Sequence, residues 1–273
     1  MKAHNISRRS FLAVTGSLVL GGLAGCGGNQ SNAADEVHYA DDEAMATIAK
    51  GWEKRQDIVD AIDDDTKNND SKYGEALQKG IQAEIDADAS LKDAKFQDSK
   101  LQEKVLAYIN ILDDQYELAG EFDSANFDFY EKWNEIYDER SMMLKDFADN
   151  YGMTVADKYA DNFKELMVNG KSAQEKSDKQ DAINALIAGA SWEKSDDGYG
   201  SFTYTAIVEN TSDYDFSNVS LTVNLYDADD VKTEAYANVT TWRKGEKAKF
   251  EAYGYQVDAQ RVEGVVTYFD VDD

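Results

Sequence analysis

Apolar residues recur at helical spacing from about residue 40 to residue 190. In the first stretch Met45, Ile48, Trp52, Val59 and Ile62 follow a 3-4-3-4 pattern, with polar residues on the opposite face. Arg55 fills the missing place in this stripe, and Arg140 interrupts a later one. Further stripes cover residues 77–85, 101–112, 130–151, 155–166 and 183–187. The pattern predicts an antiparallel helical bundle over residues 41–190.

Breaks between these helices are expected where turn-forming residues gather. They are Asp63–Asp70, the vicinity of Gly120, Tyr151-Gly152 and Asn169-Gly170. No Gly or Pro separates the second stripe from the third, so residues 72–119 form either one long helix or two. If there are two, Ser99 and Gln102 would make a capping box at the start of the second.

Near residue 190 the period changes from helical to alternating. Val219, Leu221, Val223 and Leu225 are each followed by a residue suited to the exposed face of a strand. Comparable runs cover residues 202–208, 234–242, 247–253 and 261–271, with turn sequences between them. Short strands at this spacing predict an antiparallel β-sandwich over residues 191–273. The expected fold class is therefore α+β, built as two domains.

Three segments of this β part resemble the FxLYD domain, an immunoglobulin-like module of bacterial and archaeal surface proteins. The motif Phe-x-Leu-Tyr-Asp is represented by Val223–Asp227, and Val208–Ser212 is similar to the family's Val-x-Asn-x-Ser strand end. Lys244-Gly245-Glu246 stands where the family usually has Pro-Gly-Glu. Val in place of Phe and Lys in place of Pro are departures. The resemblance implies an immunoglobulin-like sandwich and carries over no catalytic residue.

The N-terminus has the layout of a secretory signal, with a basic start and a short apolar run. Arg8 and Arg9, followed by Phe11, resemble the twin-arginine export motif. Leu23, Ala24 and Gly25 before Cys26 resemble a lipobox, in which a diacylglyceryl group joins the cysteine and the signal is cut before it. The alternative is a chance arginine pair and an ordinary buried cysteine.

The lipoprotein hypothesis divides the N-terminal region and sets the location. Residues 1–25 would be the signal peptide and residues 26–40 a flexible tether rich in Gly, Asn and Ser. Cys26 is the only cysteine, so it has no disulfide partner within the chain. The predicted location is the outer face of the cytoplasmic membrane, with the lipid anchor as the membrane contact.

Charge and residue usage exclude several kinds of function. The chain carries 54 acidic and 28 basic residues, for a net charge of −26, which predicts no nucleic-acid partner. Beyond the signal the sole histidine is His38, and no thiol other than Cys26 exists. This argues against Ser-His-Asp and Cys-His catalysis and against a His-rich zinc site. We therefore expect no enzyme, no catalytic residue and no cofactor.

Acidic residues are the remaining candidates for chemistry. Pairs within Glu84–Asp88 and Glu131–Glu139 are interpreted as solvated helix faces, with a catalytic carboxylate pair as the alternative. Asp63–Asp70 and Asp227–Asp230 are dense in oxygen ligands but do not match an EF-hand. Asp227, Asp229 and Asp230 are kept as cation candidates, although a hairpin turn explains them more simply. The aromatic stripe Tyr130-Trp133-Tyr137 is expected in the bundle core, with a ligand groove as the alternative.

These observations lead to three functional hypotheses. The first is a cell-surface lipoprotein acting as a non-catalytic binding or structural module at the envelope, with a protein, a wall polymer or a small ligand as partner. The second is a solute- or cation-binding lipoprotein serving a transporter. The third is a wall-active enzyme that uses paired carboxylates.

Overall fold

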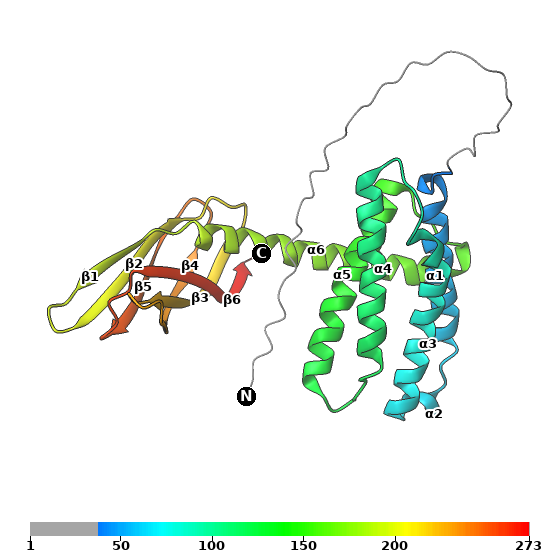
Figure 1. Cartoon of the computed structure of the whole chain (residues 1–273), viewed down its shortest axis with the longest axis horizontal. Helices are drawn as coiled ribbons and strands as arrows, with labels where there is room; N and C mark the ends of the chain where they lie inside the picture. Colours follow the sequence, from blue (N-terminus) through cyan, green and yellow to red (C-terminus); the bar gives the residue numbers. More distant parts are fainter. Residues whose placement is uncertain (1–37, 273) are drawn as a thin grey trace, which may run out of the picture. The chain divides into compact units, whose positions relative to one another are not determined.

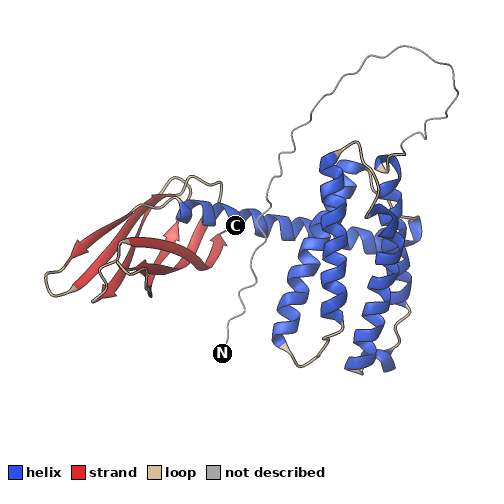
Figure 2. Ribbon diagram, viewed as in Figure 1, coloured by secondary structure: helices blue, strands red, loops and turns tan. Residues whose placement is uncertain are grey.

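A computed structural model of the chain describes residues 38–272. The expected export signal, the lipobox, Cys26 and most of the tether lie outside these residues. In the described part six α-helices precede two small antiparallel sheets (Figures 1 and 2), so the predicted α+β class with helices first is confirmed. Among residues 38–272 no helix combines the length and apolar character needed to cross a membrane.

Four long helices pack in sequence order. They are α1 (Asp41–Asp60), α3 (Asp70–Asp88), α4 (Ser99–Ala119) and α5 (Phe127–Tyr151). Their apolar stripes meet in one core, in which Ile48, Tyr108 and Phe147 are fully buried. A short helix, α2 (Asp64–Lys67), and the 3-10 turns Ala89–Leu91 and Asp157–Tyr159 lie in the connections.

The second and third stripes form two helices, which settles the alternative for residues 72–119. The 3-10 turn that follows α3 ends at Leu91, and α4 begins at Ser99. The predicted capping box is wrong by one residue, because the N-cap of α4 is Asp98. The Asp98 carboxylate accepts hydrogen bonds from the backbone N–H groups of Lys100 and Leu101, at 2.8 and 3.2 Å. Asp98 serves as well as Ser in this role.

The predicted helix break at Asn169-Gly170 is also wrong. A single helix, α6 (Ala160–Ala188), runs through both residues. A Cβ atom added to Gly170 would lie 2.4 Å from the carbonyl oxygen of Ser141 on α5. The glycine therefore permits close approach of two helices and does not end one. At Gly152 the expected break is present, with φ +72°.

The strands form two sheets of three strands each. One has the order β1 (Trp192–Asp196), β2 (Ser201–Glu209) and β5 (Lys247–Tyr255). The other has the order β4 (Lys232–Trp242), β3 (Asp215–Tyr226) and β6 (Arg261–Asp272). All the strand pairings are antiparallel. The pairing of β3 with β6 contains a register shift between Ser217 and Leu221 of β3.

A second core lies between these sheets. The predicted alternation on β3 is confirmed, because Val219, Leu221, Val223 and Leu225 are all buried. Ile183 and Ile187, near the end of α6, belong to the same core. The strand β1 has no counterpart among the predicted runs, because Trp192 is its only apolar residue and four of its five residues are exposed. Alternation cannot reveal such an edge strand.

Candidate functional site

The acidic turn at Asp227–Asp230 is held together by its own hydrogen bonds. The Asp227 carboxylate accepts from the backbone N–H groups of Asp229 and Val231, both at 2.9 Å. Asp230 has φ +60° and forms an ion pair with Arg261 at 2.9 Å. These contacts confirm the hairpin interpretation of the turn. Within residues 38–272 no cluster of three or more His, Cys, Asp or Glu side chains is arranged to hold a metal ion.

The predicted carboxylate pairs fall into two groups. Glu131, Glu135 and Glu139 are exposed on α5, as expected for a solvated face. Glu84 and Asp88 on α3 are fully buried, so the solvated interpretation is wrong for them. The predicted aromatic stripe reaches the bundle core only in part. Trp133 is half-buried and packs against the core, and Tyr137 is half-buried, whereas Tyr130 is exposed and the buried ring beside it is Phe129.

Buried Glu84 is surrounded by polar groups from three other helices. Arg140 Nη2 on α5 lies 2.8 and 2.9 Å from the two Glu84 oxygens, and Arg55 Nη1 on α1 lies 3.1 Å from Oε2. Tyr108 on α4 donates a hydrogen bond to Oε1. Gln115, also on α4, accepts a hydrogen bond of 2.8 Å from Arg55 Nη1. The two arginines that interrupted the apolar stripes therefore share one carboxylate.

Opposing effects set the ionisation of this cluster. Burial acts to raise the pKa of Glu84, but Arg140 and Arg55 outweigh it and lower the pKa below the ordinary value. Burial, assisted by the charge of Arg140, lowers the pKa of Arg55 to about 10. Burial also raises the pKa of Tyr108, so the phenol stays protonated. The cluster therefore joins four helices, α1, α3, α4 and α5.

Asp88 lies one helical turn after Glu84 and is fully buried. Neither of its carboxyl oxygens accepts a hydrogen bond from the described residues. Burial and the charge of Glu84 raise the pKa of Asp88 to about 8, against the weaker effects of Arg140 and Lys54. Asp88 is therefore protonated at neutral pH, a state that avoids an unpaired buried charge.

A different kind of site lies on the surface, at one end of the first sheet. Tyr199, Tyr253 and Tyr255 are 93, 73 and 75% exposed. Tyr253 and Tyr255 are two residues apart on β5 and therefore share a face. Tyr199 occupies the hairpin between β1 and β2, next to Gly200, whose carbonyl accepts a 3.0 Å hydrogen bond from the backbone N–H of Gln256. We call these three residues the tyrosine patch.

Local hydrogen bonds fix the hairpin that carries Tyr199. The Asp197 carboxylate accepts from the backbone N–H groups of Tyr199 and Ser201, at 2.8 and 3.1 Å. The Asp196 carboxylate accepts a hydrogen bond from the backbone N–H of Gly198 at 2.7 Å. Gly198 and Gly200 both have positive φ, a conformation that favours glycine. The ring of Tyr199 is thus presented by a structured turn.

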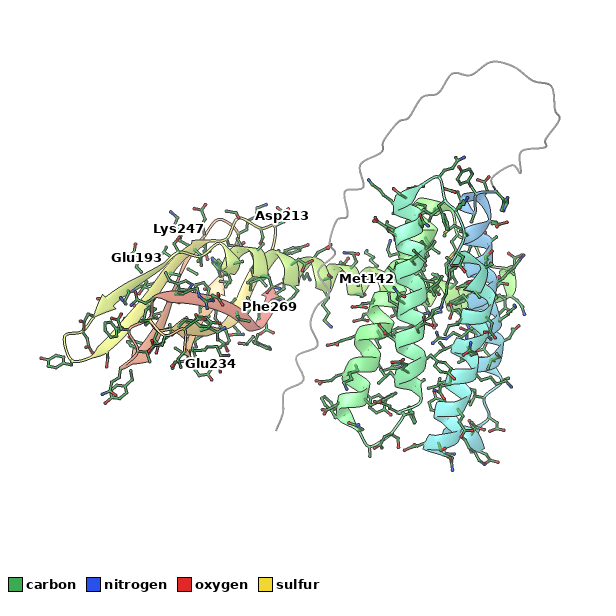
Figure 3. All side chains as sticks on the ribbon, viewed as in Figure 1. Met142, Glu193, Asp213, Glu234, Lys247 and Phe269 are labelled. Carbon is green, nitrogen blue, oxygen red and sulfur yellow. The ribbon has the colours of Figure 1, made fainter. Side chains whose placement is uncertain are left out.

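The surface around the tyrosine patch is acidic. Asp196 and Asp197 belong to the hairpin itself. Antiparallel register places Glu193 of β1, Thr205 of β2 and Glu251 of β5 in one row, next on the same face to the row that contains Tyr253. Glu251 forms an ion pair with Lys249 of the same strand at 2.6 Å, so the acidic character comes from Asp196, Asp197 and Glu193. Glu193 is labelled on β1 in Figure 3. Exposed phenol rings beside carboxylates provide apolar contact area together with affinity for cations.

Comparisons with known proteins assign no family to the chain. It matches none of the protein-family models and none of the curated proteins searched. One solved structure found by the search is the Pseudomonas fluorescens alkylpurine DNA glycosylase AlkC bound to DNA containing an abasic site analog. The match covers 80% of this chain and 74% of that one, with 8% sequence identity and a TM-score of 0.22. A likeness this small carries no argument about fold or activity.

The functional expectation drawn from the sequence is corrected at this point. A non-catalytic envelope module was expected, with a transporter-linked binding lipoprotein and a wall-active enzyme as alternatives. The one solved structure described above is a DNA glycosylase, which is none of these three kinds, and its likeness to this chain is too small to support another function. We withdraw all three as statements of function.

Proposed function

We propose that the chain recognises a basic segment of another polypeptide through the tyrosine patch. The observation that carries this proposal is the convergence of Tyr199, Tyr253 and Tyr255, each more than two-thirds exposed, on one end of one sheet. Large side chains clustered in solvent contribute nothing to the core of the domain. Such clusters are typical of interaction sites.

The residue types around the patch suit recognition of peptides. Tyr, Ser and Gly predominate in Gly198–Ser201 and Tyr253–Tyr255, a composition shared with antibody paratopes. Tyrosine offers a large contact area with few rotatable bonds, so little conformational entropy is lost on binding. A Lys or Arg side chain over an exposed ring gains about 0.5–1 kcal/mol. The neighbouring carboxylates add attraction for the same cations.

Binding of a synthetic peptide tests this proposal. A fluorescein-labelled Lys/Arg-rich peptide, and the same peptide with Glu at every basic position, are titrated with the full chain and followed by anisotropy. We expect the chain to bind the basic peptide only. The variant in which Tyr199, Tyr253 and Tyr255 are all replaced by Ser should bind it about 10- to 100-fold more weakly, from two or three lost ring contacts.

Tyr236 provides a matched control. It lies on β4 in the other sheet and is 71% exposed, so Tyr236→Ser removes a comparable ring elsewhere. None of these substitutions changes the net charge, so general attraction between an acidic protein and a basic peptide is the same in all of them. Equal affinity of the wild type and the triple variant would show that the patch is not the binding site.

Two finer points are proposed on other grounds. We propose that the two sheets are an immunoglobulin-like sandwich related to the FxLYD domain, supported by their shared core and by Asn210 of the resembling segment. Asn210 is buried and donates hydrogen bonds to the carbonyls of Tyr214 and Trp242, at 2.8 and 2.9 Å. We also propose export and lipid attachment at Cys26. This second proposal rests only on the sequence before residue 38.

A further inference from the structure

A groove of about 460 Å³ lies between α6 and β6. One wall is the face of α6 that carries Ser172, Lys176 and Lys179, and this face continues along the helix into the buried Ile183 and Ile187. The groove thus begins where α6 stops contributing to the β core. Its volume is within the range of sites for small molecules.

The opposite wall is mainly apolar, although Thr267 and Tyr268 also line it. Val266, Phe269 and Val271 of β6 line the groove and are half-buried against the β core. Phe269, labelled in Figure 3, makes an edge-to-face contact with Phe216 of β3, with ring centroids 5.6 Å apart. The apolar wall is therefore continuous with the core and held in place by it.

The charges that line the groove do not cancel. Glu175 forms a 3.7 Å ion pair with Lys171, which lies outside the groove, and Lys176 is 3.7 Å from Asp138. Lys179 is half-buried and has no ion-pair partner in the described part of the chain. In a protein with a net charge of −26, this leaves one unneutralised ammonium group beside an apolar wall.

We propose that this groove binds an amphiphile with a single alkyl chain and an anionic head group. The alkyl chain would lie along Val266, Phe269 and Val271, where burial is favourable because both partners are apolar. The carboxylate or phosphate head group would pair with Lys179. This site goes beyond the tyrosine patch and has the opposite charge preference, since the patch is acidic and the groove supplies a cation.

Dodecyl phosphate is the probe, used below its micelle concentration with the full chain made without membranes or detergent. Isothermal titration should show binding of dodecyl phosphate and much weaker binding of dodecyltrimethylammonium. Neutral dodecyl maltoside should bind about tenfold more weakly than the phosphate, because it lacks the charge for Lys179. Lys179→Ala should remove this preference, whereas Lys164→Ala, an exposed lysine on the same helix outside the groove, should retain it.

A groove-filling variant locates the binding without removing core atoms. Ser172 is exposed and lines the groove, so Ser172→Trp places an indole in it, with Ser172→Ala as the control. We expect the Trp variant to lose binding and the Ala variant to keep it. Binding that survives Ser172→Trp, equal affinity for all three head groups, or no binding by the wild type would each overturn the proposal.

Discussion

Replacing Asp88 by Asn tests whether this buried carboxyl group is protonated in the folded chain. Asp88 is fully buried, its oxygens accept no hydrogen bond from described residues, and its pKa is raised to about 8 by burial and by Glu84. Asn is nearly isosteric with protonated Asp and does not ionise. The variant should therefore resemble the wild type at low pH and become the more stable protein as pH rises.

The magnitude follows from proton linkage. The unfolded chain loses the Asp88 proton near the ordinary pKa of 3.8, whereas the folded chain keeps it up to about pH 8. Stabilisation by the bound proton is fully present below pH 3.8 and is lost as pH rises through about 8. Relative to Asp88→Asn, the wild type should lose about 3 kcal/mol of unfolding free energy between about pH 5.5 and about pH 8.5.

Urea unfolding followed by the far-ultraviolet helix signal measures this difference. Both proteins are unfolded at the two pH values, and only the gap between their unfolding free energies is compared. The titration of the many other acids, including Glu84 with its lowered pKa, acts on both proteins and largely cancels. A gap that stays constant within about 0.5 kcal/mol across this range would refute the reasoning, since a carboxyl group ionised in both states produces no such change.

Three further predictions concern packing, charge and location. Glu84→Ala leaves two buried arginines without their shared counter-ion, so it should lower the unfolding free energy by about 3–5 kcal/mol. Urea unfolding measures this loss, and a loss below about 1 kcal/mol would contradict a stabilising ion cluster. Gly170→Ala should cost about 1–3 kcal/mol, because its Cβ would lie 2.4 Å from the Ser141 carbonyl oxygen. Gly189→Ala, whose nearest contact is 3.5 Å, is its control, and equal effects contradict the close approach. Cys26→Ser should release the chain from washed membranes, and continued retention there counts against lipidation.

The helical part shows what periodicity can and cannot reveal. Apolar spacing located the long helices, and the interruptions at Arg55 and Arg140 marked positions that face the core. Their partner Glu84 could not be identified, because it lies on another helix and resembles the many solvated acids of this chain. The contact between Gly170 and Ser141 was hidden for a related reason. A glycine that ends a helix and one that admits a neighbouring helix look alike until the packing is known.

The tyrosine patch depends on strand register more than on any motif. Its three residues lie on two segments more than fifty positions apart in the chain, Tyr199 in one and Tyr253 and Tyr255 in the other. The sequence before Tyr199 predicts only a turn, although the Gly-Tyr-Gly-Ser composition of the hairpin was a usable signal. The pairing of Ser201 with Tyr255 brings the segments together. A shift of one residue on β5 would turn both of its tyrosines toward the core. The buried Phe250 and Ala252 on the opposite face prevent that shift, so the core of the β part determines where the patch can form.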